Sequence, residues 1–499
     1  MKTHCGHKNR WNDTIKRMLK AELVRKGVTR EQLSALLADI GIKETKASID
    51  NKIGRGTFSA AFMIQCLCAI GCKSLTWETE NTTGNLTINR GRQDDIVHYN
   101  EKTGLYYLDI SRKYSGGNSR KLTAISLFTG AGGLDIGLEK AGFQTIACVE
   151  NDINCIATLK HNRPGWKIFE STVKIEKGIQ KKRVAGDIKE IETEELLEFA
   201  GLKKGEASLV VGGAPCQPFS NIGKKEGRND SKNGDLFLEF VKMVKGIQPR
   251  AFLFENVAGI TQQKHSEVLK YMIDSFSGSE YGLSYSILNA ANYGVAQKRE
   301  RFFLIGIKGI SAPAFPMPTH FKDKNNYNNF VKELNPGSKV KYKPWVTVRD
   351  VLLTLPEEYY KRPDYAVMNI SEKVIERMKL IKEGENFKAL PLTMRPDCWK
   401  NGKHQGQDTF GRLNADQPSV TIRTAAYNPA KGMYIHPFEN RGLNTIEMAA
   451  LQGFPYDWFF RCSEREKITL VSGGRQIGNA VPPPLANAIG LAIRKQLTL

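Results

Sequence analysis

Residues 124–137 read Ala-Ile-Ser-Leu-Phe-Thr-Gly-Ala-Gly-Gly-Leu-Asp-Ile-Gly, an apolar run that leads into a glycine-rich turn. The run predicts a buried β-strand, and Gly130, Gly132 and Gly133 would let a ligand approach backbone N–H groups at a helix start. Glu150 ends the next apolar run, twenty residues after Gly130, where a carboxylate can accept both ribose hydroxyls. A nicotinamide dinucleotide is one candidate, although Asp135 replaces the third glycine of that motif. The pattern favours an adenosine-containing ligand.

Short apolar runs alternate with helical stretches over the region that follows. The further runs are residues 145–149, 208–211, 251–254, 285–288 and 302–307. Such alternation predicts an α/β fold with a doubly wound, mostly parallel, Rossmann-like sheet. Ligands bind such sheets at the carboxyl ends of the strands, so the residues just after each run are the candidate site.

Length, charge and cysteine content limit the class of protein. A chain of 499 residues predicts two or three domains, and a net charge of +21 favours a polyanionic partner such as nucleic acid. A basic protein that binds nothing specifically is the alternative. Nine irregularly spaced cysteines, no signal peptide and no long apolar stretch predict a soluble cytoplasmic protein without a membrane partner. His4, Cys5 and His7 lack a second ligand pair, so we expect no metal.

Residues 1–75 form the first predicted domain. Helical spacing of apolar residues predicts helices at 11–27, 29–41, 42–53 and 58–70, and Thr29 with Gln32 makes a capping-box pattern. Two short helices with a basic outer face resemble a helix-turn-helix, and a helical bundle used for packing or dimerisation is the alternative. The polar residues 76–120 are expected to be a linker with at most one hairpin.

A cysteine, an acid and a basic strand follow in the α/β region. Residues 212–220, Gly-Gly-Ala-Pro-Cys-Gln-Pro-Phe-Ser, place Cys216 after a strand, where its thiol can act as a nucleophile; a buried structural cysteine is the alternative. Glu255 ends the next strand and would share the cleft. Strand alternation puts Gln297, Arg299 and Arg301 on one face, unless they lie on a solvated edge strand.

In their order along the chain these motifs resemble the DNA cytosine-5 methyltransferases. The resemblance covers residues 122–310 and 436–495, through LFTGAGG (127–133), Glu150, GDI (186–188), GGAPCQPFS (212–220), GDLFLEF (234–240), ENV (255–257), QKRER (297–301), RGLNTIEMAALQGFP (441–455) and QIGNAVPPPLANAIG (476–490). It implies a catalytic domain at 121–310, a target-recognition domain at 311–435, and a segment at 436–499 that returns to the catalytic domain. The gap of 37 residues between Glu150 and Asp187 is a departure that makes the contacts around Asp187 less secure.

The resemblance also assigns residue roles. S-adenosylmethionine is the implied methyl donor, and its implied binding residues are Phe128, Gly130, Gly132, Gly133, Glu150, Asp187, Ile188, Gly213, Pro215, Leu236, Asn479 and Val481. Cys216 would attack carbon 6 of a cytosine flipped out of duplex DNA, and Glu255 would interact with its N3. Arg301 would hold O2, Arg299 would contact phosphate, and Gln297 would support the strand. Residues 220–228 would close over the DNA.

The implied setting is a restriction-modification system. The enzyme would modify a specific duplex site, with a possible cognate endonuclease acting on the same site and a bacterial nucleoid location. The N-terminal domain would bind operator DNA, for example that of its own gene. Two alternatives remain open: a DNA-binding regulator with a decayed enzyme domain, and an enzyme acting on transfer RNA.

Overall fold

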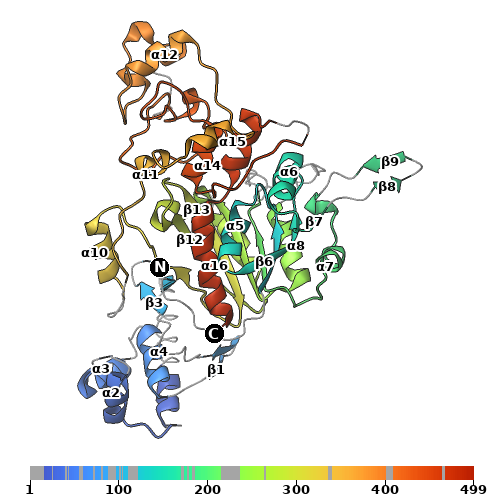
Figure 1. The fold of residues 1–499 in the computed structure, drawn as a ribbon. Helices are drawn as coiled ribbons and strands as arrows, with labels where there is room; N and C mark the ends of the chain where they lie inside the picture. The colour runs from blue at the N-terminus through green and yellow to red at the C-terminus, as the bar shows by residue number, and fades with distance from the viewer. Residues whose placement is uncertain are drawn as a thin grey trace, which may run out of the picture. The chain divides into compact units, whose positions relative to one another are not determined.

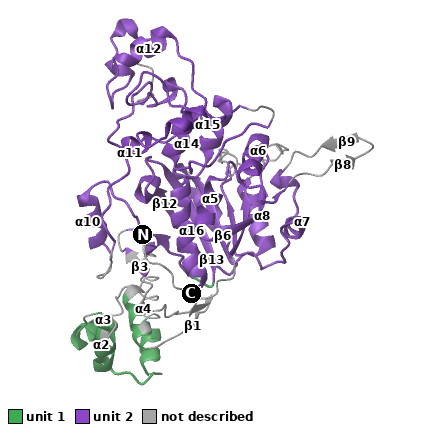
Figure 2. Ribbon diagram, viewed as in Figure 1, with its two compact units in different colours: residues 1–95, 309–311 green, residues 96–308, 312–499 purple. Residues whose placement is uncertain are grey.

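The structure is a computed structural model in which two compact units are distinguished (Figure 2). Unit 1 comprises residues 1–95 and 309–311, and unit 2 comprises residues 96–308 and 312–499. The structure describes residues 16–24, 26–39, 42, 44–55, 60–70, 74–79, 82–87, 97–100, 103, 105–110, 122–169, 173–176, 179–182, 186–214, 236–262, 266–334, 340–400, 408–463 and 467–498.

Unit 2 is built on a seven-stranded sheet, seen in the middle of Figure 1. Its strand order is β12 (Tyr281–Asn289), β13 (Glu300–Lys308), β11 (Ala251–Val257), β10 (Leu209–Gly212), β5 (Leu122–Leu127), β6 (Phe143–Val149) and β7 (Ile168–Phe169). All neighbours pair in parallel except β13, which is antiparallel to β11 and β12. The six predicted strands and the mostly parallel sheet are confirmed. The sequence did not predict β7, because two residues are too few for a pattern.

Helices cover both faces of this sheet. They are α5 (Gly133–Lys140), α6 (Ile153–Asn162), α7 (Thr193–Ala200), α8 (Leu236–Ile247), α9 (Ser266–Asp274) and α16 (Pro483–Thr498). Alternate residues of β6 show the two layers: Ala147 and Val149 belong to the core with α7, α8 and α9, and Cys148 to the core with α5 and α6. No helix in the described part of the chain is long and apolar enough to cross a membrane.

The C-terminal segment returns to the sheet, where α16 packs along α5 (Figure 1). A Cβ atom on Gly137 would lie 2.4 Å from the Pro483 oxygen, so glycine permits this close approach. Two more helices of the segment, α14 (Thr445–Gln452) and α15 (Leu470–Asn479), pack against each other. The core that contains them also includes Val348, Leu352 and Ile422.

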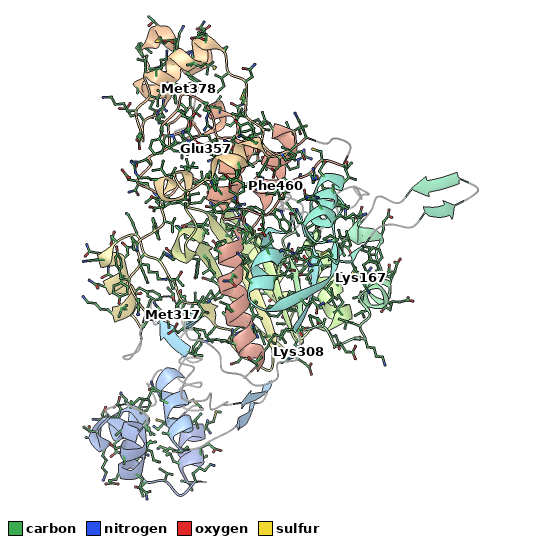
Figure 3. The ribbon with its side chains drawn as sticks, in the orientation of Figure 1. Lys167, Lys308, Met317, Glu357, Met378 and Phe460 are labelled. Atoms are coloured by element: carbon green, nitrogen blue, oxygen red, sulfur yellow. The ribbon has the colours of Figure 1, made fainter. Side chains whose placement is uncertain are left out.

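Residues 311–435 therefore do not fold around a single core. The interval contains β14 (Phe315–Pro316), α10 (Lys324–Lys332), α11 (Val348–Leu352), α12 (Glu372–Lys379) and α13 (Asp397–Lys400). A separate small core holds Met378, Ile381, Phe387, Leu390, Phe410 and Ile435. Figure 3 labels Met378 in this small core and Phe460 in the larger core shared with the C-terminal segment.

Residues 76–120 contain more structure than the single hairpin expected. Strands β1 (Ser74–Thr79) and β2 (Thr82–Thr87) pair antiparallel, as do β3 (Val97–Asn100) and β4 (Leu105–Leu108). Strand β4 also pairs with β14, and Tyr107 of β4 packs edge-on against Phe330. This polar segment forms the β3–β4 pair because an aromatic side chain in it, Tyr107, packs against Phe330, which is far away in the sequence. The interval before Asp187 holds another hairpin, β8 (Val173–Glu176) with β9 (Ile179–Lys182).

The described part of unit 1 that precedes β1 is helical. Residues 16–24 form a helix, followed by α2 (Arg30–Asp39), α3 (Lys46–Arg55) and α4 (Ala60–Ala69). The capping box is present: the Thr29 N–H donates to Gln32 Oε1 at 2.8 Å and the Gln32 N–H donates to Thr29 Oγ1 at 3.2 Å. The residues that share its core include Leu19, Leu23, Leu33, Leu37, Ile49 and Ile53. The helical prediction is confirmed in this part, while DNA binding by the unit stays a prediction.

Candidate active site

A cavity of about 520 Å³ opens at the carboxyl ends of β5, β6, β10 and β11. Its volume lies within the usual range for small-molecule sites. The predicted cofactor residues that line it are Phe128, Gly130, Gly133, Glu150, Asp187, Ile188, Gly213, Leu236, Asn479 and Val481. The predicted Glu255 and Arg301 line the same cavity. The fold thus brings together residues that are up to 353 positions apart, from Phe128 to Val481.

The glycine turn after β5 has the conformation that its sequence permits. Gly130 and Gly132 have φ values of 58° and 83°, and Phe128 has a φ of 55°, which is uncommon for a residue with a side chain. A Cβ on Gly133 would lie 2.5 Å from the Val481 oxygen, so the turn packs tightly against the C-terminal segment. Gly132 is the N-cap of α5 and is not among the residues that line the cavity, so its cofactor contact stays a prediction.

Glu150 is fixed by backbone donors. Its Oε2 accepts the Gly130 N–H at 2.6 Å, and its Oε1 accepts the N–H groups of Asn151 at 2.9 Å and Asp152 at 2.7 Å. Burial raises the pKa of this carboxyl, and the three N–H groups oppose that shift. Carboxylate oxygens have further lone pairs, so a fixed Glu150 can still accept ribose hydroxyls.

Asp187 and Ile188 reach the cavity despite the long interval before them. A Cβ on Gly186, whose φ is 69°, would lie 1.9 Å from the Glu150 oxygen, so only glycine allows the backbone to pass there. Asp187 then caps the 3₁₀ helix Ile188–Glu190 by accepting the Lys189 N–H at 3.1 Å. The extra residues form the β8–β9 hairpin and do not displace this contact region.

Glu255 and Arg301 form an ion pair at the other part of the cavity. Arg301 Nε lies 3.1 Å from Glu255 Oε1, and the side chains are 15% and 12% exposed. The antiparallel pairing of β11 and β13 sets Arg301 opposite Val257, two residues beyond Glu255. Burial raises the pKa of Glu255, and the charges of Arg301 and Arg299 oppose this shift. An acid with a raised pKa can hold a proton nearer neutral pH.

The start of the cysteine loop lies against this carboxyl. A Cβ on Gly213 would be 2.7 Å from Glu255 Oε2. The Asn256 amide donates to the Ala214 oxygen at 3.4 Å. This hydrogen bond joins β11 to Ala214, the last described residue before the cysteine. The predicted Pro215 and Cys216, and the loop at 220–228, lie outside the described residues.

Burial alternates along residues 297–301, but Gln297 and Arg299 precede β13 and are fully buried. Gln297 and Arg299 are each 0% exposed, which rules out a solvated edge strand for them. Gln297 donates to Gln452 Oε1 at 2.6 Å and accepts the Ile422 N–H at 2.9 Å, in keeping with a supporting role.

The surroundings of Arg299 give no support to the phosphate contact implied for it. The guanidinium donates to the backbone oxygens of Ile422 at 3.0 Å and Gly478 at 2.7 Å. With no exposed surface, it cannot reach a DNA backbone in this conformation. Arg299 instead ties β13 to the segment before α14 and to α15.

Sequence reasoning missed several cavity residues, among them Arg475, Gln476 and Asp152. Arg475 Nη1 lies 3.9 Å from Asp152 Oδ2, so the pair spans from α15 to the start of α6. A signal was present, because Arg475 directly precedes the Gln-Ile-Gly-Asn motif and Asp152 follows Glu150 by two residues.

A mostly parallel sheet with a glycine turn, a fixed carboxylate and a strand-end cavity defines a Rossmann-like methyltransferase fold. The chain belongs to the C-5 cytosine-specific DNA methylase family, whose model matches residues 122–495. It is thus a DNA methyltransferase, and methyltransferases of this family use S-adenosylmethionine. Residues 11–75 match a second family, described as a domain of unknown function (DUF6471).

Individual relatives agree with the family. The chain is 33% identical over 385 residues to the Type II methyltransferase M.PspPI of Psychrobacter sp. (strain TA137), covering 76% of this chain and 80% of the relative. It is 32% identical over 412 residues to the Type II methyltransferase M.Sau96I of Staphylococcus aureus, covering 80% and 83%. Among solved structures, a protein described as a DNA modification methyltransferase encoded within an E. coli prophage matches with a TM-score of 0.51 and 25% identity. That match covers 76% of this chain and 100% of the other.

Proposed function

We propose that the protein is a Type II DNA (cytosine-5-)-methyltransferase that modifies one cytosine in a specific duplex site, as the modification enzyme of a restriction-modification system. The observation that carries the proposal is the ion pair of Glu255 and Arg301 in the same cavity as Glu150 and the glycine turn. The names of the relatives support the Type II assignment. A cognate endonuclease acting on the same site belongs to this proposal.

The residues present fit the family's cofactor. Glu150 is oriented by three N–H groups, Asp187 and Ile188 lie beside it, and Asn479 and Val481 close the cavity from the C-terminal segment. S-adenosylmethionine, when bound, supplies a methyl group bonded to a positively charged sulfur. The protein's own part is to hold it and to make carbon 5 of cytosine a nucleophile.

Covalent addition to the base would supply that nucleophile. The thiolate of Cys216 adds to carbon 6, and the electron pair of the 5,6 double bond becomes available at carbon 5. Glu255 donates a proton or hydrogen bond to N3, which accepts the charge that develops, and Arg301 donates to O2. As the bond between carbon 5 and the methyl group forms, the methyl–sulfur bond of the donor would break and S-adenosylhomocysteine would leave. Transfer of the carbon 5 proton to solvent would then restore the double bond and expel the thiolate.

The depth of the ion pair supports base flipping. Glu255 and Arg301 are 12% and 15% exposed, so a base stacked in a duplex cannot contact them without leaving the stack. Extrusion costs a few kcal/mol, and phosphate contacts of a protein with net charge +21 would help to offset it.

Two experiments test this proposal. Labelled methyl transfer is measured with duplex DNA and with transfer RNA, and bisulfite sequencing of DNA from expressing cells locates the modified cytosine. We expect methylation of one duplex site and none of transfer RNA; methylation of transfer RNA alone would refute the proposed substrate. Cys216→Ser should abolish methyl transfer but leave DNA binding, and a Cys216→Ser variant that still methylates would refute the covalent mechanism.

The N-terminal unit would bind operator DNA. Its support is the pair of short helices α2 and α3. Ile49 and Ile53 of α3 are buried, and Lys52, which pairs with Glu44, is partly exposed. Deleting residues 1–75 should spare methyl transfer and abolish binding to the promoter of the protein's own gene. An inactive truncated enzyme would show that the unit is structural.

A further inference from the structure

Asp135 is a buried acid that the proposed mechanism does not use. It lies in the first turn of α5, two residues after the Gly132–Gly133 step of the glycine turn. The residue is 0% exposed, and neither carboxyl oxygen meets hydrogen-bond geometry with a partner among the described residues. A buried carboxylate without donors is strongly unfavourable, so this side chain needs an explanation beyond packing.

The groups around Asp135 disfavour a negative charge. Glu139 on α5 and Glu150 at the end of β6 are both negative neighbours, and Cys148 on β6 is a neutral thiol facing it. Glu139 itself pairs with Arg163 at 2.9 Å. Burial raises the pKa of Asp135 to about 7, and the Ser126 hydroxyl on β5 opposes the shift. The side chain therefore changes charge near neutral pH.

The Ser126 hydroxyl connects this acid to the cofactor turn. Thr129 Oγ1 donates to Ser126 Oγ at 3.1 Å, and the Thr129 N–H donates to the Val149 oxygen at 3.2 Å. The Thr129 oxygen in turn accepts the Gly132 N–H at 3.1 Å, and Thr129 lines the cavity. The Ser126 hydroxyl thus links Asp135 to Thr129, the residue whose hydrogen bonds hold the glycine turn.

We propose that Asp135 is a positioning residue that supports the glycine turn only as a neutral carboxylic acid, so that cofactor binding takes up a proton at this side chain. This inference rests on the proposed function and deepens it, because it concerns the cofactor cavity of the same enzyme. Ionised Asp135 draws the Ser126 hydroxyl and water toward itself, and the first turn of α5 shifts to admit them. The neutral acid leaves Thr129 and Gly132 in the arrangement that lines the cavity.

Calorimetry of S-adenosylhomocysteine binding to the full-length protein without DNA tests the proposal. The number of protons taken up is obtained from buffers of different ionisation enthalpy, and the Kd is measured from about pH 6 to about pH 8. We expect net proton uptake, with the Kd rising toward tenfold per pH unit above the pKa of Asp135. The cavity acids Glu150 and Glu255 also have raised pKa values, so variants must identify the group.

Asp135→Asn and Asp135→Leu both keep the site neutral, one with a polar side chain and one with an apolar side chain. If one variant does not fold, the other still provides the test. We expect each folded variant to lose the proton uptake and to bind with a Kd independent of pH. The control Glu139→Gln removes a negative charge from the same helix, where the side chain is 28% exposed, and should retain the uptake.

Proton uptake that persists in folded Asp135 variants, or is absent from the unaltered protein, would overturn the inference. A protein that binds S-adenosylhomocysteine at no pH and transfers no methyl group would instead contradict the proposed function. The two failures are therefore distinguishable.

Discussion

Replacing Arg299 by methionine separates a structural role from a DNA contact. Methionine fills much of the same buried volume but removes the donors that reach the Ile422 and Gly478 oxygens at 3.0 and 2.7 Å. Each charge-assisted hydrogen bond contributes about 1.5–3 kcal/mol, and both carbonyls would remain buried without this donor. We therefore expect Arg299→Met to lower the free energy of unfolding by about 3–5 kcal/mol.

The assay compares stability with the salt dependence of DNA binding. Urea unfolding is followed by circular dichroism, and duplex affinity is measured over a range of salt concentrations. The control is Lys298→Met, because Lys298 is exposed at the neighbouring position of the same segment. A structural Arg299 predicts a large loss of stability and, under conditions where the variant remains folded, an unchanged salt slope.

A phosphate contact predicts the opposite pair of results. Removing it would reduce the slope of log affinity against log salt by about 0.9 and leave stability within about 0.5 kcal/mol. That outcome would refute the burial argument and imply that this part of the molecule opens on DNA.

Two further predictions concern the cavity itself. Glu255→Gln should reduce methyl transfer by about 10²–10⁴-fold while S-adenosylhomocysteine binding persists, since an amide cannot donate the N3 proton as an acid does. Because burial raises the pKa of Glu255 and the protonated form is the active one, methyl transfer by the unaltered enzyme should fall as pH rises through that pKa, and the variant should lack this limb; an undiminished rate in Glu255→Gln would contradict the role. Gly133→Ala places a methyl group 2.5 Å from the Val481 oxygen and should cost about 1–3 kcal/mol of stability and weaken S-adenosylhomocysteine binding. Gly165→Ala, with nothing within 4 Å of its Cβ, is the matched control, and equal effects of the two changes would show that the close contact is unimportant.

Local patterns predicted much of the fold because they report local physics. Apolar runs located the six main strands, and the capping-box pattern of Thr29 and Gln32 appears in the structure with both of its hydrogen bonds. The same patterns predicted the residues at the strand ends, and in a parallel sheet these must meet at one edge. Glu150 and Glu255 therefore line one cavity, as expected from their positions.

Other features depend on which distant segments cover a given face. The sequence predicted that Gln297, Arg299 and Arg301 share one side, because the side chains of an extended chain repeat every two residues. Only the tertiary structure decided that Arg299 donates hydrogen bonds to the oxygens of Ile422 and Gly478, whereas Arg301 forms an ion pair with Glu255. Likewise the sequence places Asp135 in a helix start, where an acid is ordinary. Packing buries it completely, and neither oxygen meets hydrogen-bond geometry with a partner among the described residues. Periodicity fixes the direction of a side chain, but burial and charge depend on residues hundreds of positions away.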